Sequence, residues 1–391
     1  MAPTWSLFSA SVSALISVGS VYAILRSRSS VPYLRDADAP PPPAWPLVSI
    51  IVPARDEAAA IEAATASRLA QDYPSLELVL IDDRSTDATP GIIDRLAAGD
   101  SRITTVHLTE LPEAWLGKLY ALDQGVRRAR GEWLLFTDAD VTFAPDTLRR
   151  AVAWCEHRGF DHLAVLPDFN PQSPLLDACL DIFVGGLIIG GRLWSVSDPK
   201  SRAAVGGGLF GLVRRSAFER TGAFESLRME VADDVALGQL LKDSGARPTV
   251  LNAVGYVSLD FYRSLTELAC GLEKSTFPVI ARFSVARLIL IVGLMIYVET
   301  GSWLVAAFAT DLPARLVGLA AGLTLLGGSV ALASWLRRSL WSPLLKPVAC
   351  VVFGVMLLRA GLTAWWQGGI DWRGTRYPLA ALRAGQRVRF P

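Results

Sequence analysis

Long apolar segments near both ends constrain the fold of this chain more than any other feature of its sequence. Residues 5–25 contain no charged side chain and are long enough to cross a lipid bilayer. They lack the basic leading segment and the small-residue cleavage site of a signal peptide, so we expect a retained anchor. Three further candidate spans, residues 288–309, 316–336 and 347–366, follow much later. The sequence therefore predicts a multi-pass membrane protein with transmembrane helices at both ends.

Basic residues beside these segments indicate their orientation. Arg26 and Arg28 directly follow the first span, which places that end in the cytoplasm by the positive-inside rule. Arg337, Arg338 and Lys346 lie between the second and third C-terminal spans. Further basic residues follow the third span: Arg373, Arg376, Arg383, Arg387 and Arg389. Three complete crossings would put the tail outside, which the rule disfavours, so the sequence leaves open that one segment is re-entrant or interfacial.

Ionisable residues interrupt several apolar segments. Glu299 lies in the first C-terminal span and Arg359 in the third, and charges at that depth are expected to face protein, water or lipid headgroups. Residues 175–194 are also apolar but contain Asp177 and Asp181. A complete crossing there would split the surrounding domain, so we expect an interfacial helix that guides a lipid.

The region between the spans alternates short apolar strands with helices. Expected strands at residues 48–52, 76–81, 103–108 and 133–136 are separated by helical stretches, which predicts a parallel α/β sheet with right-handed crossovers. We therefore divide the chain into an anchor (1–28), a proline-rich linker (29–46), a cytoplasmic α/β domain with interfacial helices (47–280), a transmembrane region (281–368) and a basic tail (369–391). The net charge of +1 gives no indication of nucleic-acid binding.

Two aspartates follow the strand at residues 133–136 directly. Asp138 and Asp140 are separated by one residue, so both carboxylates can lean toward one point at the carboxyl edge of the sheet, where ligands collect. Carboxylates in this arrangement suit Mg²⁺ or Mn²⁺ that also holds phosphate oxygens. A solvated turn after a strand is the simpler interpretation of an isolated pair of this kind.

Five ordered motifs carry a family resemblance. They read Val-Pro-Ala-Arg-Asp-Glu (52–57), Asp-Asp-Arg-Ser-Thr-Asp (82–87), Gly-Lys-Leu-Tyr-Ala-Leu (117–122), Thr-Asp-Ala-Asp (137–140) and Asp-Asp-Val-Ala-Leu-Gly (233–238). Together they resemble family 2 glycosyltransferases with the GT-A fold, a Rossmann-like α/β fold. Within that family the chain is most similar to the membrane-anchored group that glycosylates lipids, which includes hopanoid-associated, carotenoid and ceramide glycosyltransferases. The resemblance covers residues 48–277.

This resemblance implies a donor site for a nucleotide sugar. The implied donor-binding residues are Pro53, Ala54, Asp56, Glu57, Asp82, Asp83, Lys118, Asp138 and Asp233. Lys118 would place a point charge on the diphosphate, and the metal would be held by Asp140 above all, with Asp138. Acids near a helix start also have a purely structural use, and Ser85 and Asp87 are expected to cap the helix that follows them.

The resemblance also implies a site for the acceptor. Gly206, Gly207 and Gly208 would line the sugar and acceptor site, and Asp234 matches the general base that takes a proton from the acceptor hydroxyl. The chain has Asp233 where the family usually has Glu. The Gln-x-x-Arg-Trp motif of many processive members is absent, and Lys274 is a candidate replacement cation. Residues 372–377 are similar to a Trp-basic-Gly-x-x-Tyr signature of the lipid-modifying group.

We therefore expect an inverting hexosyltransferase of an inner membrane, with a cytoplasmic catalytic domain, that moves a sugar from a UDP-sugar to a lipid hydroxyl. A processive polysaccharide synthase and a non-catalytic nucleotide-sugar-binding protein are the alternatives. A dinucleotide-binding oxidoreductase would need a Gly-x-Gly-x-x-Gly turn after the first strand, where Pro53-Ala54-Arg55 stands instead. The sequence leaves the sugar, the lipid and the oligomeric state open.

Overall fold

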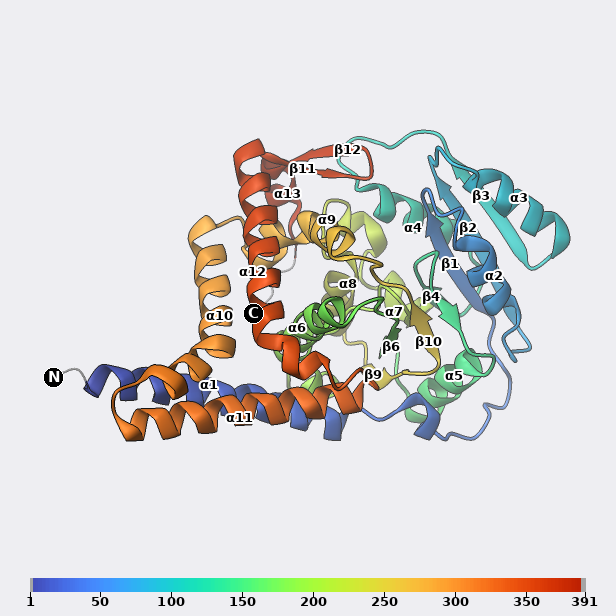
Figure 1. The fold of residues 1–391 in the computed structure, drawn as a ribbon. Coiled ribbons are helices and arrows are strands. Elements are labelled where there is room, and N and C mark those ends of the chain that lie inside the picture. The colour runs from blue at the N-terminus through green and yellow to red at the C-terminus, as the bar shows by residue number, and fades with distance from the viewer. Residues whose placement is uncertain (1–2, 388–391) are drawn as a thin grey trace. The chain divides into compact units, whose positions relative to one another are not determined.

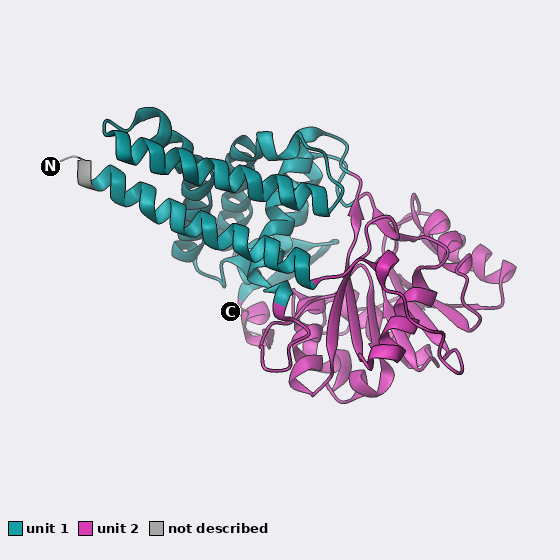
Figure 2. Ribbon diagram, turned by 90° about the horizontal axis from the view of Figure 1, so that it is seen from below, with its two compact units in different colours: residues 1–30, 171–194, 261–379 teal, residues 31–170, 195–260, 380–391 magenta. Residues whose placement is uncertain are grey.

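A computed structural model describes residues 3–387, which form two compact units. Figure 2 colours them separately. Of the described residues, unit 1 contains 3–30, 171–194 and 261–379, and unit 2 contains 31–170, 195–260 and 380–387. The chain therefore leaves and re-enters unit 2 twice. Two segments of the domain expected at residues 47–280, namely 171–194 and 261–280, group with the helices of unit 1.

Unit 2 is built around a seven-stranded sheet with the order β3-β2-β1-β4-β8-β6-β9 (Figure 1). Its strands are β1 (Val48–Ala54), β2 (Leu76–Asp83), β3 (Ile103–Leu108), β4 (Trp133–Phe136), β6 (His162–Leu166), β8 (Gly211–Arg214) and β9 (Pro248–Asn252). Both β2 and β4 are buried along their whole length, as their runs of large apolar side chains require. A second sheet pairs β10 (Val257–Leu259) with β5 (Thr142–Phe143) and β7 (Asp168–Phe169).

The main sheet contains both parallel and antiparallel pairs of strands. Strands β1 to β4 pair in parallel as predicted, but β8 runs antiparallel between β4 and β6. Helix α6 (Pro174–Gly190) and the irregular segment at residues 196–210 lie between β7 and β8 in the chain. Residue 211, where β8 begins, lies opposite Phe136 at the end of β4, so the glycine-rich loop before β8 is brought to the carboxyl end of β4.

The helices of unit 2 are α2 (Ile61–Leu69), α3 (Thr89–Gly99), α4 (Gly117–Arg128), α5 (Thr147–Arg158), α7 (Arg215–Glu219), α8 (Asp233–Asp243) and the C-terminal α13 (Leu379–Gly385), with short 3₁₀ turns at Leu34–Asp36 and Ala223–Leu227. Helix α4 packs on β1 and β2. A Cβ on Gly125 of α4 would lie 2.6 Å from Ile51, so glycine permits the close approach that places the start of α4 near the strand ends.

Unit 1 contains the long apolar helices. These are α1 (Pro3–Ser30), α6 (Pro174–Gly190), α10 (Val285–Phe308), α11 (Leu312–Trp335) and α12 (Ser342–Gln367), joined by the shorter α9 (Leu265–Ser275), a 3₁₀ turn at Leu193–Ser195 and a π-helical turn at Thr276–Ile280. Five segments in the described part of the chain are long and apolar enough to cross a membrane. Helix α12 begins five residues before the predicted start at Pro347, because a proline so near the start of a helix removes only one hydrogen bond.

A β-hairpin follows α12 directly. Strands β11 (Gly369–Trp372) and β12 (Thr375–Pro378) are joined by Arg373 and Gly374, which have φ values of 47° and 73°. Two central residues with positive φ give the tight turn that matches the twist of a hairpin. The signature at residues 372–377 is therefore the turn and second strand of this hairpin.

Candidate active site

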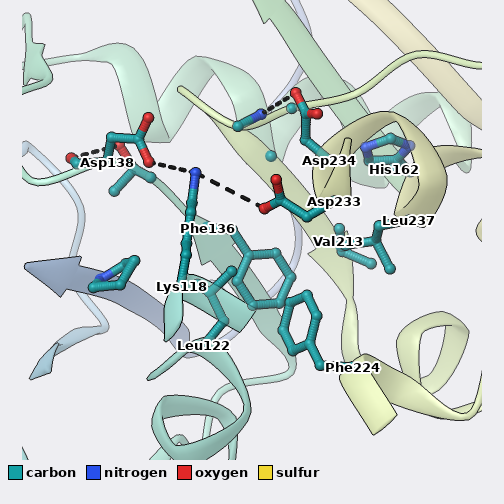
Figure 3. Close-up of a pocket in the computed structure, with 15 residues that line it drawn as sticks. Lys118, Leu122, Phe136, Asp138, His162, Val213, Phe224, Asp233, Asp234 and Leu237 are labelled. Carbon is teal, nitrogen blue, oxygen red and sulfur yellow. Dashed lines mark hydrogen bonds and ion pairs between the residues drawn. The ribbon is translucent and has the colours of Figure 1, made fainter. Parts of the chain in front are cut away.

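One pocket in unit 2 collects residues from four of the five motifs (Figure 3). Its polar residues include Lys118, Asp138, Asp233 and Asp234, from the starts of α4 and α8 and from the loop after β4. Pro53 and two glycines of the loop before β8 complete this side. Its apolar residues include Leu122, Phe136, Val213, Phe224 and Leu237. Segments far apart in the sequence meet here because β1, β4 and β8 are neighbours in the sheet.

Lys118 connects two of the acids. Its Nζ lies 2.7 Å from Asp138 Oδ1 and 3.8 Å from Asp233 Oδ2. Burial disfavours the ammonium charge, but the carboxylates of Asp138 and Asp233 outweigh burial and raise the pKa of Lys118 above its ordinary value. Lys118 therefore stays charged at neutral pH, which suits a group that faces a diphosphate.

Asp140 lies in an excess of negative charge. Burial, followed by repulsion from Asp138 and Glu57, raises the pKa of Asp140 to about 6. Arg68 is fully buried, and its guanidinium donates to the backbone carbonyl oxygens of Asp138 and Val141, the latter at 3.0 Å. These hydrogen bonds hold the loop after β4 in the shape that keeps the two aspartates close.

The two aspartates of this loop fit a hard divalent cation. Mg²⁺ is commonly bound through one or two carboxylates plus substrate phosphates, and Asp138 and Asp140 lie in the loop after β4 with one residue between them. Within residues 3–387 no group of three Asp, Glu, His or Cys side chains is arranged to hold an ion. Further ligands would therefore come from substrate oxygens or water.

Asp234 is placed against the glycine loop. The backbone N–H of Gly208 donates to Asp234 Oδ2 at 3.2 Å, and the N–H of Val235 donates to Oδ1 at 2.8 Å. A Cβ on Gly206 would lie 2.6 Å from Asp234 Oδ2 and equally close to the backbone nitrogen of Val235. The glycines therefore allow the loop to touch this carboxylate directly, and the loop fixes its orientation.

Replacing Gly206 with alanine should displace Asp234. The added methyl group has no room beside the carboxylate and the start of α8, and a shift of about 1 Å in a reacting group can cost on the order of 10² in rate. We expect turnover in Gly206→Ala to fall by roughly that factor while donor binding, measured by calorimetry, changes little. Gly91→Ala is the matched control, because nothing lies within 4 Å of its Cβ position. Unchanged turnover in Gly206→Ala would show that this close approach is not required.

Asp82 and Asp83, at the end of β2, are buried and do not line the pocket. Both carboxylates lie close to basic side chains. Asp83 pairs with Arg84 at 2.8 Å and lies 3.9 Å from Arg55. Asp82 accepts the backbone N–H of Ser85 and lies 3.4 Å from His107. Both carboxylates are fixed in place at the edge of the sheet.

The loops after β1 and β2 are joined by their side chains. Asp56 Oδ1 accepts the N–H of Thr86 at 2.7 Å, and Ser85 Oγ accepts the N–H of Asp56 at 3.0 Å. Asp87 accepts the N–H of Thr89 at the start of α3 and that of Ala58. The structural role expected for Ser85 and Asp87 therefore differs in part: Asp87 supports the start of α3, while Ser85 connects the two loops.

Sequence reasoning missed the apolar lining and His162. His162 lies on β6, is 2 % exposed and lines the pocket, and burial lowers its pKa to about 4. A single histidine at the start of a strand carries no motif, and Phe224 belongs to a short turn with no signal of its own. The pairing of β6 with β8 brings His162 to the pocket, and Phe224 reaches it by packing on Phe136 of β4.

A mixed α/β sheet with acids after the strand ends and a glycine loop against α8 defines a domain of the GT-A fold. The structure of a mannosyltransferase from Pyrobaculum calidifontis in complex with GDP-Man and Mn²⁺ shares this fold, with a TM-score of 0.54, 22% identity, and coverage of 90% of this chain and 99% of that one. Residues 49–195 match the family model "Glycosyl transferase family 2".

Two curated proteins are similar to part of the chain. Succinoglycan biosynthesis protein ExoO of Rhizobium meliloti is 36% identical over 114 residues, 29% of this chain and 31% of that protein. The 4,4'-diaponeurosporenoate glycosyltransferase of Staphylococcus aureus is 24% identical over 218 residues, 55% of this chain and 56% of that protein. The chain thus spans between about a third and just over half of the length of the curated relatives it matches.

Proposed function

We propose that this protein is an inverting glycosyltransferase that transfers a sugar from a nucleoside-diphosphate sugar to a hydroxyl group of a membrane lipid. One observation carries the proposal. In a domain of glycosyltransferase family 2, Lys118, Asp138, Asp233 and Asp234 converge on one pocket, where the glycine loop holds Asp234. The cation can bind a diphosphate, and an aspartate held by the glycine loop can take the proton of a hydroxyl group.

The donor would bind across the strand ends. Lys118 supplies positive charge for the diphosphate, and Asp82 and Asp83 are the proposed acceptors for N–H and O–H groups of the base and ribose. Asp138 and Asp140 would hold Mg²⁺ or Mn²⁺, which neutralises the charge of the leaving diphosphate when bound. The similar mannosyltransferase holds GDP-Man and Mn²⁺, which supports this class of donor; we favour a UDP-sugar.

Asp234 would activate the acceptor. Its carboxylate accepts the proton of the acceptor hydroxyl while that oxygen forms a bond to the anomeric carbon. The bond from the anomeric carbon to the diphosphate breaks on the opposite face, so the configuration inverts and the nucleoside diphosphate leaves. The hydrogen bond from the N–H of Gly208 holds the Asp234 carboxylate in one orientation before the acceptor hydroxyl binds.

A membrane lipid is the acceptor class that the rest of the chain supports. Within the described residues, five apolar helices are long enough to cross a membrane, and one relative is named 4,4'-diaponeurosporenoate glycosyltransferase. The absent Gln-x-x-Arg-Trp motif speaks against a processive polysaccharide synthase. The catalytic unit would lie on the cytoplasmic side of an inner membrane, where nucleotide sugars are available.

The test is a transfer assay with the full chain in nanodiscs. Radiolabelled UDP- and GDP-sugars are supplied with a total lipid extract and Mn²⁺, and products are separated into organic, polymer and free-sugar fractions. We expect one donor to label a discrete lipid in the organic fraction, and no label with Asp234→Asn. Label that accumulates only as ethanol-insoluble polymer would favour the synthase. No transfer with any donor, although donor binding is measurable, would favour a non-catalytic protein.

A further inference from the structure

We propose that the C-terminal segment at residues 380–387 positions Asp233 and Asp234, and that Glu230 is the positioning residue through which it acts. The proposal rests on the proposed function, because it extends the roles given there to the two aspartates. It follows from contacts within unit 2. Residues 228–232, which lead directly into Asp233 and Asp234, are called the bridging segment below.

The bridging segment connects two parts of the pocket wall. It follows the 3₁₀ turn at Ala223–Leu227, in which Phe224 is buried. Phe224 packs on Phe136 of β4 with ring centroids 5.2 Å apart, and both rings line the pocket. At its other end the bridging segment stops where α8 begins, at Asp233. A displacement of the bridging segment would therefore move the start of α8 relative to the pocket.

One side of the bridging segment is attached to the residues before Lys118. The N–H of Leu116 donates to the carbonyl oxygen of Arg228 at 2.8 Å. The guanidinium of Arg228 lies 5.8 Å from the ring centroid of Trp115. Leu116 and Trp115 are both buried and directly precede α4, whose second residue is Lys118. These contacts fix the beginning of the bridging segment relative to the lysine of the donor site.

The other side of the bridging segment is in contact with the C-terminal segment. The chain rejoins unit 2 at Ala380, and Leu382 of α13 is buried. Gly385, the last residue of α13, lies directly against Met229: a Cβ on Gly385 would lie 2.2 Å from Cβ and 3.3 Å from Cα of Met229. These atoms belong to the backbone or adjoin it, so they cannot swing aside. The absence of a side chain at Gly385 therefore permits this contact.

Glu230 adds a hydrogen bond to the same contact. The backbone N–H of Arg387 donates to Glu230 Oε2 at 2.9 Å. The Glu230 side chain is 2 % exposed, and a buried carboxylate is costly without hydrogen bonds. The backbone N–H of Glu230 donates to the carbonyl oxygen of Leu227 at 2.8 Å. Glu230 is therefore held through its main chain and through its side chain.

The C-terminal segment acts on the pocket indirectly, because none of the described residues 380–387 lines it. Its contacts fix the bridging segment, and the bridging segment sets where the carboxylate of Asp234 lies. A shift of about 1 Å in a reacting group can cost on the order of 10² in rate. The long side chain of Lys118 can follow a small shift of Asp233 and still face the diphosphate. We therefore expect turnover to depend on the C-terminal segment more strongly than donor binding does.

Two substitutions at Arg387 isolate the hydrogen bond in the full chain in nanodiscs. Arg387→Pro removes the backbone N–H, whereas Arg387→Ala keeps it. We expect turnover at saturating donor and lipid to fall at least about tenfold in Arg387→Pro and to stay near the wild-type value in Arg387→Ala. Donor affinity, measured by calorimetry, should change less than turnover in both variants. Wild-type turnover in Arg387→Pro would refute the proposal.

Substitutions at Glu230 test the acceptor of the same hydrogen bond. Glu230→Leu removes the acceptor oxygen, and Glu230→Gln keeps one. We expect turnover to fall in Glu230→Leu and to be largely restored in Glu230→Gln. Combining Glu230→Leu with Arg387→Pro should cause little further loss, because both remove one interaction and residues in contact are not additive. Independent losses that multiply in the double variant would contradict the proposal.

Gly385→Ala tests the packing contact, and Gly99→Ala is its matched control. Gly99 is the last residue of α3, as Gly385 is of α13, and nothing lies within 4 Å of its Cβ position. We expect lower turnover in Gly385→Ala alone. Parallel losses of turnover, donor binding and melting temperature in Gly385→Ala and Arg387→Pro would show that the contact serves stability only, and would overturn the positioning role.

Hydrogen–deuterium exchange tests the positioning role without any sugar transfer. Exchange at the amides of residues 228–236 is compared between wild type, Arg387→Pro and Arg387→Ala. We expect faster exchange in the bridging segment and at the start of α8 in Arg387→Pro only. The same exchange in all three proteins would overturn the proposal. A wild-type protein that transfers no sugar would instead refute the proposed function, and exchange would still report whether the C-terminal segment orders the start of α8.

Discussion

Asp234→Asn is expected to lower the rate of sugar transfer by at least about 10²-fold while donor binding survives. An acceptor hydroxyl is a poor nucleophile at neutral pH, and a positioned base contributes roughly 10² to 10⁴ in rate. Asparagine keeps the size of the side chain and can still accept the N–H of Gly208, but it cannot take the proton. The measurement is single-turnover transfer at saturating donor and lipid, with donor binding followed by calorimetry.

The variant Asp233→Asn distinguishes the role of Asp233 from that of Asp234. Asp233 lies 3.8 Å from Lys118 and belongs to the pair of carboxylates that hold this cation, so its loss should weaken donor binding more than it slows the chemical step. If turnover in Asp234→Asn stays near normal while Asp233→Asn abolishes it, the base is Asp233.

Asp140→Asn is expected to weaken donor binding by at least about tenfold, equivalent to roughly 1.4 kcal/mol, and to make the protein insensitive to Mn²⁺. Wild-type protein should lose donor binding in EDTA and regain it with Mn²⁺ or Mg²⁺, because Asp138 and Asp140 would hold the metal that neutralises the charge of the diphosphate. Asp146→Asn is the control, since Asp146 pairs with the nearby surface residue Arg150. Full donor binding by wild type in chelator would exclude the metal.

Stability without metal gives a second test of Asp140. Its pKa of about 6 in the folded state exceeds that of an unfolded aspartate, near 4. The folded protein therefore binds this proton more tightly, and the stabilisation is fully present below pH 4 and lost as the pH rises through 6. Metal-free Asp140→Asn should lose this pH dependence and melt no lower than wild type at pH 7. A lower melting temperature for the variant would show that Asp140 is stabilised by its surroundings.

Local signals explain what could be predicted before the structure. The strands at residues 103–108 and 133–136 have the predicted bounds, because runs of β-branched and large apolar residues between polar turns specify a strand. The motif residues Lys118, Asp138, Asp233 and Asp234 follow strand ends or begin helices, and parallel strands bring such positions to one edge of a sheet. Their meeting in one pocket could be anticipated, although the roles that we assign to them await the mutants above.

The sequence by itself determined the strand–helix alternation, the family of the domain and the apolar helices, because each is encoded in short-range spacing. Only the tertiary structure decided that β8 pairs with β6, which brings His162 to the pocket, and that Phe224 packs on Phe136. Only it decided that α1 and α11 are parallel and that residues 380–387 return to unit 2. These features depend on contacts between residues far apart in the chain, and hydropathy, which reports length and composition, cannot distinguish a helix that crosses a membrane from one that lies along it.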